Sequence, residues 1–205
     1  MKTSKKTLLP VAAVAIALIA QSIQIGNAAT ATDQVQLSTT VQETIALSCG
    51  ADVNLGSLTP GTPVTGSTTC TTTTNANGGY DLAVRRDDAD TTIDLGSNAA
   101  INIADKTAWT PLTPNGAVYS GTGLAFRVRT TGTTATYNST WWGSDDTDPN
   151  ALYAGFPTAY ANIMQHSSYS ATSTDTVVGY KLDVPTTQQS GVYNGTVTYQ
   201  VTSKP

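Results

Sequence analysis

The sequence predicts an all-β protein, specifically an immunoglobulin-like antiparallel β-sandwich with one long irregular insert. Thr, Val and Tyr, which favour strands, are abundant, whereas Glu, Lys and Arg, which favour helices, are scarce. Only 12% of the residues are charged. Short runs alternate between apolar and polar residues, and Gly, Pro and Asn separate them, as expected for strands joined by turns.

Residues 1–28 have the three-part plan of a secretory signal peptide. Three lysines precede an apolar stretch over residues 8–20, and small residues follow it. The apolar stretch is shorter than the roughly 20 residues that a membrane span needs. We therefore expect a mature chain with no membrane span, secreted to the cell exterior or surface, in which residues 29–205 form a single β-sandwich domain. The candidate cleavage positions follow Ala28, Ala29 and Ala31.

The charge balance argues against nucleic acid or an anionic membrane as a partner. The chain has 10 basic and 14 acidic residues. Three basic residues and no acidic residue lie in residues 1–28, so the mature charge is 7 − 14 = −7. A surface with this balance repels polyanions.

The only two cysteines, Cys49 and Cys70, are expected to form a disulfide. In an exported protein a single cysteine pair most simply forms a bridge. A zinc site is disfavoured because His166 is the only histidine that could complete it. The bridge closes a Gly-, Pro- and Thr-rich loop that has little apolar surface of its own.

The alternation predicts strands in order along the chain. A long first strand over residues 34–47 is expected to bend near residues 38–40. Residues 53–58 form a short strand or turn, residues 68–74 are extended, and residues 75–79 form a turn. Further strands are expected over residues 80–85, 93–95, 101–104, 124–129, 176–184 and 192–201. Residues 130–165 are the least regular part.

Several short motifs resemble a known family. A strand leading to Cys49 is followed by VNLGSL, Cys70 precedes NANGGYDLAV, and the last strand reads SGVYNGTVTYQV. These motifs resemble the immunoglobulin-like subunits of the spore-coat-U and archaic chaperone–usher pilin family. They also resemble, more loosely, bacterial surface domains. The likeness covers residues 41–84 and 178–201; Leu55 stands where the family has an aromatic residue, and the insert has no counterpart.

The resemblance implies a non-enzymatic structural subunit of the cell surface that forms fibres or pili. Its partners would be further copies of itself or other surface proteins, and no cofactor is expected. Two alternatives remain open at this point: a carbohydrate-binding adhesion module and an extracellular hydrolase. The hydrolase is disfavoured because His166 has no G-x-S-x-G serine motif to work with.

An aromatic group in the insert is the candidate carbohydrate site. Aromatic rings beside Asp and Asn side chains are typical of sugar-binding surfaces. The alternative, which we favour, is that one or both indoles pack at an edge of the sandwich core. The residues concerned are Tyr137, Trp141, Trp142 and Tyr153.

Two acidic turns are weak calcium candidates, since carboxylate oxygens suit Ca²⁺. Neither turn has the EF-hand spacing, and we expect solvated turns that bind calcium weakly or not at all. The aspartates of the second turn are also candidates for a glycosidase carboxylate pair, but clustered loop aspartates repel one another and we favour solvated side chains. The residues are Asp87, Asp88 and Asp90 in the first turn, and Asp145, Asp146 and Asp148 in the second.

Residues 29–44 have two possible fates. In the family that the chain resembles, such a strand completes the sandwich of the next subunit by β-augmentation. Val35, Leu37 and Val41 alternate in a way that suits this role. The opposing interpretation, which we favour from sequence, is that the segment pairs within its own chain beside residues 192–201.

Overall fold

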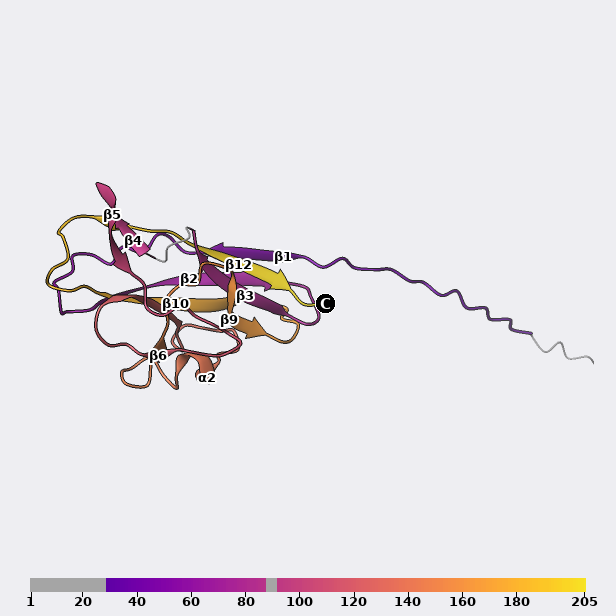
Figure 1. Ribbon diagram of the computed structural model, residues 1–205. Coiled ribbons are helices and arrows are strands. Elements are labelled where there is room, and N and C mark those ends of the chain that lie inside the picture. Colours follow the sequence, from indigo (N-terminus) through magenta and orange to yellow (C-terminus); the bar gives the residue numbers. More distant parts are fainter. Residues whose placement is uncertain (1–28, 88–91) are drawn as a thin grey trace, which may run out of the picture. The chain divides into compact units, whose positions relative to one another are not determined.

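The computed structural model describes residues 29–87 and 92–205 (Figure 1). The predicted signal peptide and the calcium candidates Asp88 and Asp90 lie outside these residues. Residues Val41–Pro205 form a compact unit. The all-β prediction is confirmed, because strands dominate and α2 (Ser139–Trp142) is a single short turn of helix. No helix within the described ranges is long and apolar enough to cross a membrane.

One main sheet has the strand order β1-β2-β10-β7, and all its neighbours are antiparallel. β2 lies inside the sheet because β1 and β10 both pair with it, and every second residue from Thr68 to Thr74 is buried against the core. The strands are β1 (Ile45–Cys49), β2 (Val64–Thr74), β10 (Thr174–Asp183) and β7 (Gly123–Val128).

The second main sheet has the order β12-β3-β9, again antiparallel. Its strands are β12 (Val197–Ser203), β3 (Tyr80–Arg86) and β9 (Ala161–His166). Two small sheets, β11-β4-β5 and β6-β8, complete the fold. They contain β11 (Tyr193–Asn194), β4 (Thr92–Leu95), β5 (Asn98–Ala104), β6 (Ala117–Val118) and β8 (Leu152–Tyr153).

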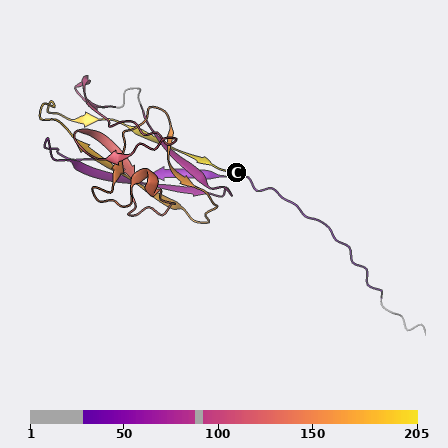
Figure 2. The same ribbon diagram turned by 60° about the horizontal axis from the view of Figure 1, so that its bottom comes forward.

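The core lies between the two main sheets, which form the layers of a sandwich (Figures 1 and 2). Leu82 and Val84 of β3 and Phe126 and Val178 of the first sheet have no exposed surface. Burial of such a side chain stabilises the fold by about 1.5–3 kcal/mol. The predicted sandwich is therefore confirmed.

A buried ion pair links β3 to the chain that follows β5. Arg86 Nη2 lies 2.6 Å from Asp105 Oδ1, and neither side chain has more than 1% of its surface exposed. The Arg86 N–H donates to the carbonyl of Pro157, and its guanidinium lies over the ring of Phe156. Both charges are thus paired, as burial of an ion requires.

The insert that follows β7 packs aromatic side chains into the core of the sandwich. Trp142 lies 4.4 Å from Trp109 and 5.3 Å from Phe126, measured between ring centroids. Its indole N–H donates to the carbonyl of Ile163 in β9. The insert is therefore packed on the sandwich through its tryptophans.

Two expectations about the first strand are wrong. The chain enters β1 only at Ile45, and residues 29–44 form no strand. The expected pairing of this segment beside residues 192–201 is therefore absent from the structure. Its apolar side chains alternate correctly for a strand, but within the described residues no strand pairs with it. Residues 192–201 divide into β11 and β12, because β11 pairs with β4 and β12 pairs with β3.

The predicted disulfide is confirmed. Cys49 and Cys70 face each other at the end of the β1–β2 pairing, with their Cα atoms 3.9 Å apart. The loop between them packs Val53 and Leu55 over Gly66, where an added Cβ would lie 2.6 Å from Val53 Cγ1. The bridge thus holds the end of β1, an outer strand, against the sheet.

We predict that loss of this bridge lowers the free energy of unfolding by about 3 kcal/mol, because the unfolded chain regains loop freedom. Urea unfolding of the oxidised protein, compared with a Cys49→Ala, Cys70→Ala variant, measures the difference. Reductant should destabilise only the natural chain. Equal unfolding midpoints for the two proteins would contradict the prediction.

Candidate functional site

The two main sheets meet along one side of the sandwich at β1 and β12. Each of these strands is the last in its sheet. Figures 1 and 2 both show them side by side and running in opposite directions. Ser203 Oγ donates to Glu43 Oε2 over 3.2 Å, which joins the end of β12 to the start of β1. The outer backbone edges of both strands have no strand partner within the described residues.

The side chains of these two strands that point into the sandwich are only half-buried. Paired residues of antiparallel strands share a face, so Leu47 points inward with its partner Thr72, and Tyr199 with its partner Val84. Thr72 is 1% exposed and Val84 0%. We name this set the open edge; it consists of Ile45, Leu47, Val197, Tyr199 and Val201, all of intermediate burial.

Comparison with an immunoglobulin domain shows what the open edge lacks. Constant-type domains place strands A-B-E-D in one sheet and C-F-G in the other. Here β1-β2-β10-β7 has the A-B-E-D order, β3 corresponds to C and β12 to F. Within residues 29–87 and 92–205, no strand takes the place of G beside β12. Among the described residues, therefore, no strand covers the core along this side.

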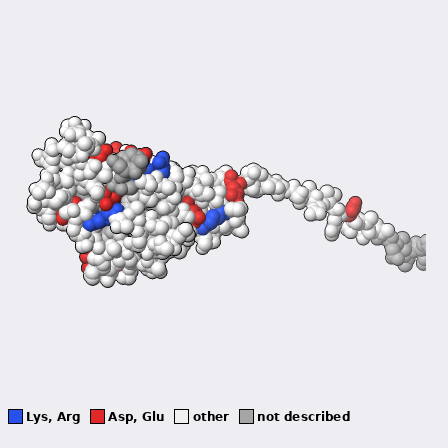
Figure 3. All heavy atoms as spheres, in the orientation of Figure 1, with Lys and Arg blue, Asp and Glu red and all other residues white. Residues whose placement is uncertain are grey.

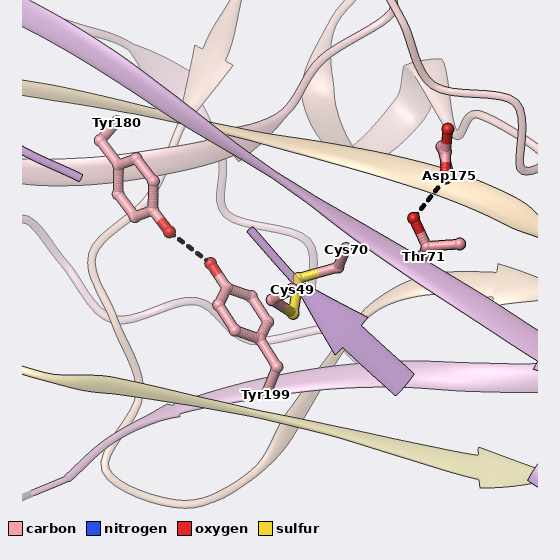
Figure 4. The surroundings of a disulfide bond; sticks show 6 residues. All are labelled: Cys49, Cys70, Thr71, Asp175, Tyr180 and Tyr199. Atoms are coloured by element: carbon pink, nitrogen blue, oxygen red, sulfur yellow. Dashed lines mark hydrogen bonds between the residues drawn. A yellow bond between two sulfur atoms is a disulfide. The ribbon is translucent and has the colours of Figure 1, made fainter. Parts of the chain in front are cut away.

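A pair of tyrosines joins the two sheets beneath the open edge. The hydroxyls of Tyr180 in β10 and Tyr199 in β12 lie 2.7 Å apart, near the disulfide (Figure 4). Burial raises the pKa of both phenols, that of Tyr199 well above its usual value. Both groups therefore remain protonated at neutral pH, and the pair holds β12 to the opposite sheet. On the other side of β2, Thr71 donates to Asp175 over 2.6 Å.

The segment before β1 exposes its apolar side chains. Val35 is 83% exposed, Leu37 91% and Val41 78%. We name residues 29–41 the leading segment. It has no Gly or Pro, and Asp33 is its only charge. Exposed apolar residues at alternate positions are what a strand presents before it pairs.

The candidate carbohydrate residues do not form an exposed aromatic platform. Trp142 has no exposed surface, so the core interpretation holds for it. Trp141 is half-buried and packs edge-on against Trp109, with ring centroids 5.4 Å apart. Trp109 was not singled out from sequence, because it lies more than thirty residues before the pair that it contacts.

The two tyrosines of this group are also occupied. Tyr137 accepts a hydrogen bond from Arg127 Nη2 and donates to the carbonyl of Gly143. Tyr153 lies beneath the Arg127 guanidinium and the Lys181 ammonium, 5.6 and 5.4 Å from its ring centre. Both tyrosines therefore make contacts that hold the insert together.

The three aspartates of the second acidic turn each contact different partners. Asp145 accepts hydrogen bonds from Thr147 and Asn150 of its own loop, and Asp148 pairs with Lys181 at 2.6 Å. Asp146 accepts the backbone N–H groups of two residues, at 2.8 and 3.0 Å, and lies 3.2 Å from Arg127. In the part of the chain that the structure describes, no acidic cluster is arranged to hold a metal ion.

Burial opposes ionisation of Asp146, but hydrogen bonds outweigh it. The N–H groups of Thr131 and Thr130, with the Arg127 charge, lower the pKa of this carboxyl to about 2. The carboxylate thus fixes the loop after β7 to the insert. Asp87, of the first turn, is exposed and its N–H donates to the carbonyl of Thr196.

The charged groups drawn in Figure 3 form no broad basic surface on that face. Lys and Arg side chains appear there in small groups, next to Asp or Glu. The described ion pairs involving Asp146, Asp148 and Asp81 show the same local matching. The open edge itself contains no charged residue.

Asp146→Asn should lower the free energy of unfolding at pH 7 by about 1–3 kcal/mol, since the loop loses bonds to an ionised acceptor. The folded pKa lies below the usual 3.8, so this stabilisation is full above about pH 4 and is lost as the pH falls towards 2. Urea unfolding across this range, followed by Trp fluorescence, should show the variant and natural proteins converging. The more exposed Asp148→Asn is the control and should cost under about 1 kcal/mol. A difference that does not change with pH would contradict the assignment.

A scan against protein-family models finds none that matches this chain. A search of curated proteins finds no match either. The resemblance to spore-coat-U and archaic chaperone–usher pilins therefore stays a prediction from short motifs.

Proposed function

We propose that this protein is a secreted, non-enzymatic structural subunit that assembles into fibres at the cell surface. In the fibre, the leading segment of one copy lies along the open edge of the next. The observation that carries the proposal is the half-buried inward face of β1 and β12, left without a covering strand. The exported location rests on the signal-peptide pattern and agrees with the disulfide.

The open edge offers both kinds of interaction that an added strand needs. The outer edge of β12 presents backbone N–H and C=O groups that a further strand would satisfy. The inward side chains Leu47, Tyr199 and Val201 present apolar surface that it would cover. Each apolar side chain that becomes fully buried stabilises the complex by about 1.5–3 kcal/mol.

The leading segment has the composition that such a strand requires. Val35, Leu37 and Val41 lie on one side of an extended chain, because their spacings are multiples of two. Gln36, Ser38 and Thr40 lie on the other side, where polar side chains face solvent, whereas Thr39 lies between Leu37 and Val41 on the apolar side. Pairing of the segment with another copy explains why its alternation predicts a strand that the single chain does not form.

Repetition of this contact produces a filament. The segment and the open edge are different surfaces of one chain, so each copy can donate to one neighbour and accept from another. A contact between unlike surfaces propagates without closing unless its rotation forms a ring. The adhesin alternative is weakened, because Trp142 is buried and cannot cover the face of a sugar.

Removal of residues 29–39 should abolish polymers and leave a folded monomer, because Val41–Pro205 is compact without them. Electron microscopy and size-exclusion chromatography of the mature protein and the truncated form provide the test. A synthetic peptide of residues 29–43 should bind the truncated monomer and raise its melting temperature.

The same peptide with Leu37→Asp should lose binding, since it places a charge in the apolar edge. Gln36→Asp is the matched control, because it adds the same charge on the solvent side and should bind nearly as well. A natural protein that stays monomeric, together with a truncated form that ignores the peptide, would sink the proposal.

A further inference from the structure

A single asparagine fixes the backbone immediately before β1. The N–H of Thr44 donates to Asn75 Oδ1 over 2.6 Å, and Asn75 Nδ2 donates to the carbonyl of Gln42 over 2.9 Å. The Asn75 N–H also donates to the carbonyl of Thr44, over 3.3 Å. We name these three hydrogen bonds the Asn75 clamp.

The clamp prolongs the pairing of β1 with β2. Ile45 pairs with Thr74, so Thr44 is opposite Asn75 in the same register. The Thr74 hydroxyl adds a further bond to the Thr44 carbonyl at 2.8 Å. Residues 42–44 are exposed but held by these bonds as an extension of β1. Val41, the next residue outward, is 78% exposed and has no hydrogen-bond partner among the described residues.

A strand that directly precedes β1 reaches the open edge of its own chain only by turning back. If residues 42–44 formed the loop, Val41 would lie opposite Ile45, and Leu37 opposite Cys49. Opposite residues of antiparallel strands share a face, so both apolar side chains would point inward. Three-residue hairpin loops are common. For the leading segment to fold back into its own open edge with its apolar side chains inward, residues 42–44 would have to form the loop. These are the residues that the Asn75 clamp holds extended.

Turns further from β1 place polar or charged side chains in the open edge. A two-residue turn at residues 40–41 places Gln36 opposite Ile45 and Gln34 opposite Leu47, with both amides inward. A three-residue loop at 39–41 brings Val35 inward but buries the carboxylate of Asp33 opposite Leu47. Burial of an unpaired charge is strongly unfavourable. A parallel approach is also prevented, because parallel neighbours need a connection of about a dozen residues.

We propose that the Asn75 clamp keeps the leading segment out of its own open edge, so that the edge accepts the segment of a second copy of the chain. This inference rests on the proposed function and names the residue that selects the partner. The hydrogen bonds of Asn75 go to residues 42 and 44, which lie between the leading segment and β1, so Asn75 acts by positioning residues 42–44. Release of the clamp converts an assembling subunit into a self-closed monomer.

The experiment compares Asn75→Ala with Asn115→Ala in the mature chain. Asn115 is a matched control, because its side chain also accepts from one backbone N–H, of Thr110, and donates to one carbonyl, of Ala108. Asn75→Ala should slow polymerisation at least tenfold. In dilute monomer its amides of residues 37–41 should gain at least tenfold protection from hydrogen exchange. Asn115→Ala should match the natural chain in both measurements.

Asn75→Asp provides a graded second variant in case the alanine variant does not fold. It keeps the acceptor for Thr44 but places a carboxylate oxygen against the Gln42 carbonyl, so its effects should be smaller and in the same direction. Folded Asn75 variants whose leading segment exchanges as fast as the natural one would overturn the inference. A natural chain that never polymerises would instead overturn the proposed function. In that case hydrogen exchange of the monomeric chains would still test the role of the clamp.

Discussion

The core of a β-sandwich is shielded from solvent only where strands cover it, and within the described residues no strand covers the side between β1 and β12. The inward side chains of β1 and β12 are half-buried, whereas their partners on the adjacent strands are fully buried. The structure along that side depends on this constraint. A strand added there, as we propose, would cover this apolar surface and pair with the backbone groups of β12.

The chain keeps the open edge in shape without that strand. The disulfide holds the end of β1 to β2, and the Tyr180–Tyr199 hydrogen bond holds β12 to the opposite sheet. The Asn75 clamp fixes the start of β1. These three interactions involve β1 or β12, the two strands that flank the uncovered side. They oppose a shift of either strand that would narrow or widen the open edge.

Local sequence patterns could predict the strands that pair within the chain. The runs that became β3, β7 and β10 alternate clearly, and the structure places them within a few residues of their predicted bounds. The cysteine pair could be predicted from composition. Residues 34–44 could not be placed, because alternation shows that a segment can pair and not whether its partner belongs to the same chain. Core packing of the Trp pair could be favoured from sequence, but not which indole is buried nor that it contacts Trp109, since Trp109 is distant in sequence.

The most direct measurement mixes two altered chains that cannot assemble alone. The first lacks residues 29–39 and keeps its open edge; the second carries residues 29–43 fused by a flexible linker after Pro205, which fills its own edge and leaves its leading segment free. Sedimentation velocity of the mixture should show a one-to-one heterodimer, because one free segment meets one free edge. A mixture that sediments as two monomers at every concentration would contradict the account.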